Sequence, residues 1–161
     1  MNKQLIMIFM ASAMTGCATT DIGKYKNNPD MPIVIGDYFQ SPPSTTGGVA
    51  FEFIGYNNTE KTIRYVYFNM VHRNRTDNIV RDDISGLEVK SYMFVGPFAN
   101  EGKFNRKFGP HFYNDAATCV ELKGVRVEYM DGTTIELKGE SLSKTFAFSG
   151  SACRNVAEHQ E

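Results

Sequence analysis

The stretch TIRYVYFNMVH, residues 62–72, carries the strongest structural signal in this chain. Its odd-numbered residues share one face of an extended chain, its even-numbered residues share the other, and both faces are largely apolar. Aromatic and β-branched residues follow one another here, and such residues lose side-chain freedom in a helix. The composition and the period of two therefore predict a β-strand.

Strand patterns flank this stretch on both sides. Residues 49–56 alternate with the same period, and an asparagine-rich turn separates them from 62–72, so the two runs are predicted to be antiparallel strands joined by a short loop. Residues 33–39 indicate a first strand. Residues 87–95 indicate a further strand that stops at Gly96-Pro97, because proline lacks a ladder donor.

The clearest hairpin lies in the last third of the chain. Residues 119–130 and 133–137 alternate around Asp131-Gly132, which favours a type I′ turn with positive φ at both central residues. Residues 145–148 alternate once more. Since no long stretch is amphipathic with helical spacing, the predicted fold class is all-β, an antiparallel β-sandwich.

Composition agrees with this fold class and argues against one class of partner. The chain has 12 Phe and 8 Tyr, and such rings suit a pleated, half-buried surface. Lys and Arg together number 17 against 18 Asp and Glu. With no basic excess to neutralise phosphates, nucleic-acid binding is not expected.

The first residues have the features of a secretory signal. Lys3 gives a positive start, an apolar run extends to Met14, and Met14-Thr15-Gly16-Cys17 supplies a small-residue stop. The run is too short to remain as a transmembrane helix. These last four residues resemble the lipobox of bacterial lipoproteins, which implies a signal peptide at 1–16 and a covalent lipid, carrying diacylglycerol and palmitate, at Cys17.

That resemblance sets the predicted domain boundaries. Residues 17–31 are polar and aperiodic, and are expected to form a flexible lipidated tether. The β-sandwich domain is predicted at 32–154, and a polar tail at 155–161. Ala18 after the cysteine resembles the sorting pattern for the outer membrane, which implies a protein anchored on its periplasmic side, with the cell surface as the alternative.

Cys119 and Cys153 are expected to form a disulfide. An exported chain enters an oxidising compartment, where thiols tend to pair. A bridge between these positions would close a loop long enough for a chain-entropy gain of roughly 3.5–4 kcal/mol. The alternative is two free thiols, one of them catalytic.

Several segments together resemble a family of small bacterial envelope proteins. They are Gly48-Val49-Ala50-Phe51, the asparagine turn and strand opening at 57–66, Gly96-Pro97, and Glu128-Tyr129-Met130-Asp131-Gly132-Thr133. Over residues 48–137 this set is similar to immunoglobulin-like, FxLYD-type sandwich domains. The resemblance implies an immunoglobulin-like fold and no particular reaction.

A basic, glycine-containing segment, residues 98–110, is predicted to be an exposed loop. Between residues 102 and 113 cations interleave with aromatic rings, and arginine and aromatic residues are the types that anchor interfaces. The candidate partner-binding residues are Phe104, Arg106, Lys107, Phe108, Phe112 and Tyr113. Alternatively, the rings cover one end of the sandwich. A second basic candidate, for acidic glycans or lipid head groups, consists of Arg64, Arg73, Arg75 and Arg81.

The sequence contains no recognisable catalytic or metal-binding motif. Its histidines, which are His72, His111 and His159, lack the spacing of metal ligands. Asp82-Asp83 is expected to be a solvated turn, and no serine lies in a Gly-x-Ser-x-Gly elbow.

These observations predict a membrane-anchored, non-catalytic binding or assembly module. Its expected partners are the outer-membrane lipid, reached through Cys17, and another envelope protein. No metal is expected, and no cofactor besides the covalent lipid. The alternative is an envelope-polymer hydrolase whose site is assembled from distant strands.

Overall fold

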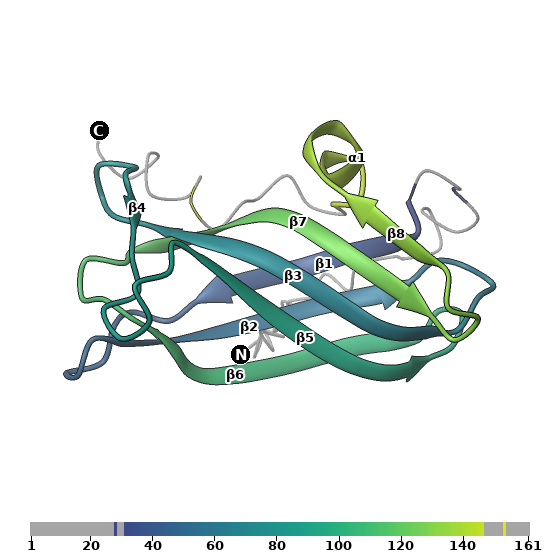
Figure 1. Ribbon diagram of the computed structural model, residues 1–161, viewed down its shortest axis with the longest axis horizontal. Helices are drawn as coiled ribbons and strands as arrows, with labels where there is room; N and C mark the ends of the chain where they lie inside the picture. The colour runs from purple at the N-terminus through teal and green to yellow at the C-terminus, as the bar shows by residue number, and fades with distance from the viewer. Residues whose placement is uncertain (1–27, 29–30, 147–152, 154–161) are drawn as a thin grey trace, which may run out of the picture.

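The computed structural model describes residues 28, 31–146 and 153, and strands dominate this part of the chain (Figure 1). The elements are, in chain order, β1 (Ile33–Gln40), β2 (Gly48–Asn57), β3 (Ile63–Arg73), β4 (Ile79–Val80), β5 (Val89–Phe98), β6 (Lys103–Tyr113), β7 (Cys119–Tyr129), β8 (Thr134–Leu137) and α1 (Gly139–Ser143). The predicted signal peptide at 1–16, the tail at 155–161 and most of the tether at 17–31 lie outside the described residues.

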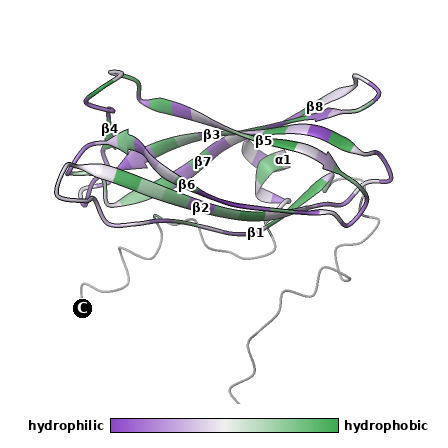
Figure 2. Ribbon diagram, turned by 90° about the horizontal axis from the view of Figure 1, so that it is seen from below, coloured by the Kyte–Doolittle hydropathy of each residue, from purple (hydrophilic) through white to green (hydrophobic). Residues whose placement is uncertain are grey.

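The strands form two antiparallel sheets that pack face to face (Figure 2). One sheet has three strands in the order β1-β2-β6. In the second, five-stranded sheet, β3 lies between β7 on one side and β5 and β4 on the other, and β8 extends the sheet beyond β7. The chain passes repeatedly between the sheets, as in immunoglobulin-like domains. The prediction of an all-β, antiparallel sandwich is confirmed.

The predicted pairing of the two clearest strands is wrong, because β2 and β3 lie in different sheets. Phe53 of β2 and Phe68 of β3 meet across the core with ring centroids 3.9 Å apart. The connection turns around buried Asn57, whose Nδ2 donates to the carbonyl oxygens of Lys61 and Phe98 at 2.8 and 2.9 Å. Two strands with strongly apolar inner faces bury more surface face to face than side by side.

The β7–β8 hairpin is confirmed, with a different turn from the one predicted. Gly132 has a φ of 82°, whereas Asp131 is not among the described non-glycine residues with positive φ. The Oδ1 atom of Asp131 accepts hydrogen bonds from the backbone and the hydroxyl of Thr133, at 2.9 and 2.6 Å. A longer connection with one left-handed glycine therefore replaces the type I′ turn.

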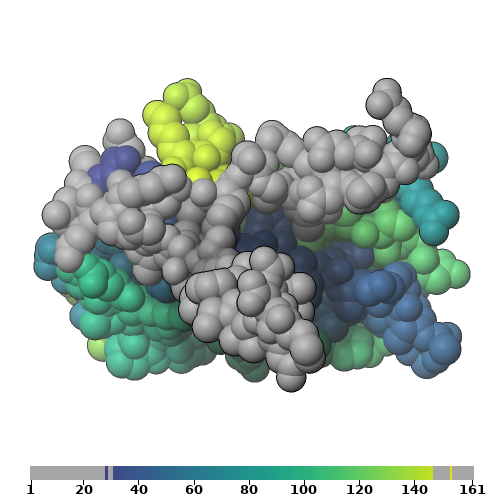
Figure 3. All heavy atoms as spheres, turned by 180° about the vertical axis from the view of Figure 1, so that it is seen from behind, coloured from purple at the N-terminus to yellow at the C-terminus, as the bar shows by residue number. Residues whose placement is uncertain are grey.

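Two segments depart from the predicted boundaries. Strand β5 continues through Gly96-Pro97 to Phe98. A Cβ at position 96 would stand 2.4 Å from the carbonyl oxygen of Ile63, so glycine allows β5 to pass close to β3. The short helix α1, which projects from the body of the molecule (Figure 3), was not predicted.

The segment predicted at 145–148 is described only as far as Phe146. That residue forms an isolated parallel bridge with Ile35 of β1, so this part of the chain contacts the edge of the three-stranded sheet. Residues 147 and 148 lie outside the described residues.

Aromatic rings from both sheets fill the core. The large buried rings are Tyr38, Phe51, Phe53, Phe68, Tyr92, Phe94, Phe104, Phe108, Phe112 and Tyr129. Gly55 makes room for one of them, since a Cβ there would stand 2.1 Å from Cε2 of Phe104. Met31, the last residue of the predicted tether, is also buried, so the packed domain begins at this residue or before it.

Candidate interaction surface

The segment predicted to be an exposed loop, residues 98–110, is mostly strand, so the prediction of a loop is wrong. Residues 103–113 form β6, which pairs with β2. Phe104, Phe108 and Phe112 point into the core and are at most 6% exposed. These rings are therefore part of the core and do not cover one end of the sandwich, as the alternative expected. Every fourth residue is buried in β6, and this spacing hid the strand period from sequence reasoning.

Two cations of β6 occupy different faces of the strand. Arg106 is exposed although its register partner on β2 is the fully buried Phe53, which places it on the inward-facing side of the strand. Its guanidinium lies 5.0 Å from the ring centroid of Phe108. Lys107 pairs in register with Glu52 on the outer face of the sheet. Tyr113, at the end of β6, is half-buried.

The outer face of β5 carries exposed apolar side chains on both sides of Ser91. We call Val89, Met93 and Val95, together with Leu87 just before the strand, the β5 stripe; their exposed fractions lie between 41% and 58%. On β3, Tyr65 is the register partner of Val95, and Tyr67 is that of Met93. These half-buried rings widen the apolar surface beyond β5.

The inner face of β5 is apolar too, because Tyr92 and Phe94 belong to the core. A strand that is apolar on both faces differs from the usual pattern of one buried and one wet face. That double pattern is the sequence signal from which the β5 stripe could be predicted.

Strand β5 is also an edge strand. Its only described ladder partner is β3, and β6 pairs only with β2 among the described strands. The two free edges lie on the same side of the sandwich, where Tyr92 packs on Phe108 and Phe94 on Phe104, with ring centroids 5.2 and 5.6 Å apart.

A shallow groove of about 310 Å³ opens above these rings, between the two edges. It is lined by Lys90, Ser91, Tyr92, Met93, Arg106, Phe108 and His111. The groove thus joins one residue of the β5 stripe to Arg106, one of the predicted binding residues.

At one end of the groove, the buried Asp82 forms an ion pair with the partly exposed Lys90, with 2.7 Å between Oδ2 and Nζ. The prediction of a solvated Asp82-Asp83 turn is therefore wrong for Asp82, which is 1% exposed. Burial raises the pKa of Asp82, but hydrogen bonds from Lys90, from Ser85 and from the Tyr113 backbone N–H outweigh it and hold that pKa below its usual range. Nothing in the spacing of Asp82 and Lys90 along the sequence predicts that they pair.

His72 lies beside that pair and is fully buried. Its Nδ1 is 2.7 Å from Oε1 of Gln40, and its ring stacks on Phe112 with centroids 3.8 Å apart. The pKa of His72 is lowered to about 4, mainly by burial; Lys90 adds to this effect, and Asp82 opposes it. Tyr92, whose hydroxyl is 3.5 Å from Nε2 of His72, has its pKa raised by burial and by Asp82. The imidazole is held neutral within the packing.

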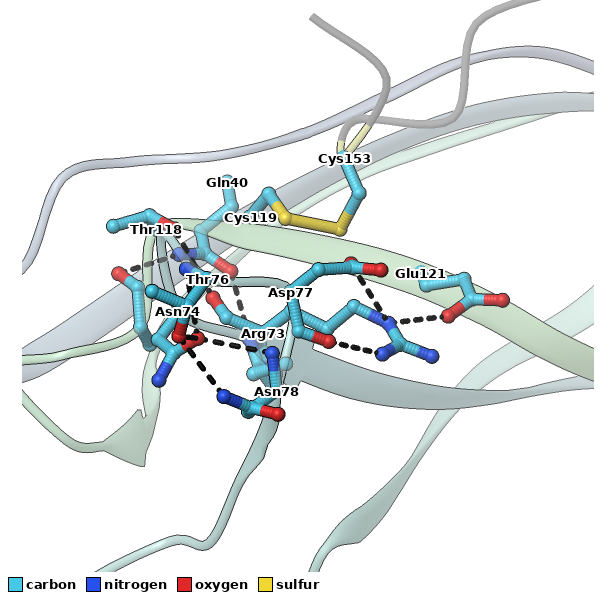
Figure 4. Close-up of a disulfide and its surroundings, with 12 residues drawn as sticks. Gln40, Arg73, Asn74, Thr76, Asp77, Asn78, Thr118, Cys119, Glu121 and Cys153 are labelled. Atoms are coloured by element: carbon cyan, nitrogen blue, oxygen red, sulfur yellow. Dashed lines mark hydrogen bonds and ion pairs between the residues drawn. A yellow bond between two sulfur atoms is a disulfide. The ribbon is translucent and has the colours of Figure 1, made fainter. Parts of the chain in front are cut away.

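Cys119 and Cys153 are joined in a disulfide, as predicted (Figure 4). The bridge lies over β7, near the ion pair of Arg73 with Glu121, in which 2.7 Å separates Nε from Oε2. The alternative of two free thiols is wrong for this structure.

The four arginines proposed as a basic patch do not act as one. Arg64 pairs with Glu128 at 3.7 Å, and Arg81 pairs with Glu88 at 2.8 Å. Arg73 is paired with Glu121, and Arg75 lines a separate hollow beside Pro43. Scattered and largely neutralised charge gives an acidic ligand little to bind.

The remaining predictions on single residues concern the ends of the chain and the histidines. Cys17 and His159 lie outside the described residues. His111 is exposed and lines the groove. Among the described residues, no group of three or more His, Cys, Asp or Glu side chains could hold a metal ion. No helix in that same part of the chain is long and apolar enough to cross a membrane.

Comparison with known proteins gives no match to a family model, to a curated protein or to a solved structure. The resemblance to FxLYD-type domains therefore stays a prediction.

Proposed function

We propose that this protein is an outer-membrane lipoprotein, of the FxLYD-type envelope family, whose β-sandwich binds another envelope protein and catalyses no reaction. One observation carries the binding role, namely the β5 stripe on a free sheet edge. Contiguous apolar side chains exposed to water mark interaction sites. Tyr65 and Tyr67 beside the stripe are rings of the type that anchors such contacts.

The anchor is supported by the sequence before the domain. Met14-Thr15-Gly16-Cys17 follows a charged start and an apolar run, which is the order of a cleaved and lipidated signal. Several acyl chains on one cysteine hold a protein at a membrane, whereas a single chain binds only marginally. A sandwich confined in this way meets its partner in the plane of the membrane, so even a modest contact surface suffices.

The anchor is tested by labelling cells with radioactive palmitate. The wild-type chain is expected to carry label and to sediment with the membrane fraction. Cys17→Ala should carry none, and should leave that fraction. The double variant Cys119→Ala/Cys153→Ala is the control and should keep its label. Label retained by Cys17→Ala, or absent from the wild type, would rule out the anchor.

The binding role is tested by a photo-crosslinking residue placed at Met93 in intact cells. We expect one discrete cross-linked envelope protein from this position. Ile135 on β8 is the matched control, since it is exposed on another strand of the same sheet and should give no such product. If no position on the sandwich yields a cross-linked protein, the binding role is refuted.

A further inference from the structure

The free edge of β5 has little protection against pairing with another strand. Natural sheets shield their edges with charge, proline, bulges or shortness. Strand β5 has ten residues, with Lys90 near its start, and with Pro97 and a register irregularity between Val95 and Phe98 near its end. Between them, residues 91–96 contain neither a charge nor a proline. Their backbone groups on the side away from β3 pair with no described strand and can receive an additional one.

The two faces of such an added strand would contact the β5 stripe and the groove. Its outward side chains would lie beside Met93 and Val95 of the β5 stripe, so apolar residues fit there. Its inward side chains would enter the groove towards β6, where Arg106 and His111 line the wall.

The charge of the groove wall determines which inward side chains of the added strand would bind. Lys90 is already neutralised by Asp82. Arg106 is exposed and forms no ion pair with any residue that the structure describes, and its inward-facing position directs it to the groove. The described lining residues of the groove include no carboxylate. A carboxylate on the inward face would therefore meet an unpaired cation, whereas a lysine there would be repelled.

We propose that β5 accepts an extended segment of a partner protein as an added strand, in which apolar residues that continue the β5 stripe alternate with acidic residues that pair with Arg106. This inference rests on the proposed binding function and names the chemistry of the partner. Main-chain hydrogen bonds supply affinity in such strand addition, and the alternating side chains supply specificity.

The test uses two labelled peptides, Thr-Val-Glu-Val-Glu-Val-Thr and Thr-Val-Lys-Val-Lys-Val-Thr, with fluorescence anisotropy on the full chain in detergent. The wild type is expected to bind the acidic peptide on the order of tenfold more tightly at low salt. Arg106→Glu should reverse this order. Lys107→Glu is the matched control, because it makes the same change in net charge on the outer face of β6, and it should keep the wild-type order.

A second pair of variants tests the apolar half of the proposal. Met93→Lys should weaken binding of both peptides, and Ile135→Lys on β8 should not. Circular dichroism and the thermal midpoint of each variant establish that the sandwich is folded.

Three outcomes would overturn the inference. The first is no measurable binding of either peptide to the wild type. The second is an equal response to Arg106→Glu and Lys107→Glu. The third is a dimer in light scattering that Met93→Lys dissociates, which would mean that a second copy of this chain covers β5. An envelope protein cross-linked from elsewhere on the sandwich would leave the proposed function standing even if the peptide experiment fails.

Discussion

The groups that surround His72 favour its neutral imidazole over the charged form. Phe112 stacks on one side, Gln40 meets Nδ1, and the Tyr92 hydroxyl lies near Nε2. The nearby Asp82 is already engaged by Lys90, so its attraction for an imidazolium is largely offset. At the residue scale, the histidine is therefore a place where the stability of the fold depends on pH.

The folded chain should lose stability on mild acidification because of His72. Its folded pKa of about 4 lies below the ordinary 6.5, so between these values the unfolded state binds the proton more readily. The contribution of the neutral His72 to the free energy of unfolding is therefore full above pH 6.5 and is lost as pH drops toward 4. Between pH 7 and pH 5 the free energy of unfolding should fall by about 2 kcal/mol.

Urea denaturation at the two pH values measures this difference. His72→Gln should be less stable at pH 7 and should lose most of the pH dependence in this window. His111→Gln is the control, because His111 is exposed, and it should retain the wild-type slope. An unchanged slope in His72→Gln would assign the dependence to other groups.

Strands β2 and β6 show at the element scale what a sequence period can and cannot specify. The alternation in 49–56 correctly predicted a strand but not its neighbour, because an apolar face fits both a hairpin and a face-to-face arrangement. Strand β6 was missed because its inward position 106 opens on the groove and holds an arginine. The polar run around it therefore resembled a loop.

The contact between these two strands depends on the missing side chain at Gly55. Gly55→Ala would place a Cβ 2.1 Å from the Phe104 ring, in the middle of the core. Such overpacking should lower the free energy of unfolding by about 2–3 kcal/mol. Guanidinium denaturation measures the loss.

Gly109→Ala on β6 is the matched control for this prediction. A Cβ at position 109 meets no atom within 4 Å, so this variant should change stability far less. Equal effects of the two substitutions would show that backbone freedom, and not the close approach of Phe104, explains the cost at Gly55.

For the whole molecule, local patterns in the sequence were enough for the fold class, and chemical context was enough for the disulfide. Strand period and turn residues are local properties, and they specified the sandwich. The two cysteines could be paired because no other cysteine remained once Cys17 was assigned to the lipid. The groove was not predictable in the same way, since it requires knowing that the free edges of β5 and β6 lie on one side of the molecule. Residues such as Met93 and Arg106 become neighbours only through that topology.

The disulfide stabilises the sandwich as a whole by limiting the unfolded chain. It joins residues 34 positions apart, of which Cys119 is buried at the start of β7. Closing a loop of this length is expected to contribute roughly 3.5–4 kcal/mol, mainly by reducing the entropy of the unfolded state. The variant Cys119→Ala/Cys153→Ala should therefore unfold at lower denaturant concentration by this amount, and a reducing agent should have the same effect on the wild type but none on the variant. Cys17→Ala keeps the bridge and should match the wild type in the same denaturation experiment. Equal stability of the double variant and the wild type would mean that the bridge does not restrict the unfolded chain enough to stabilise the fold.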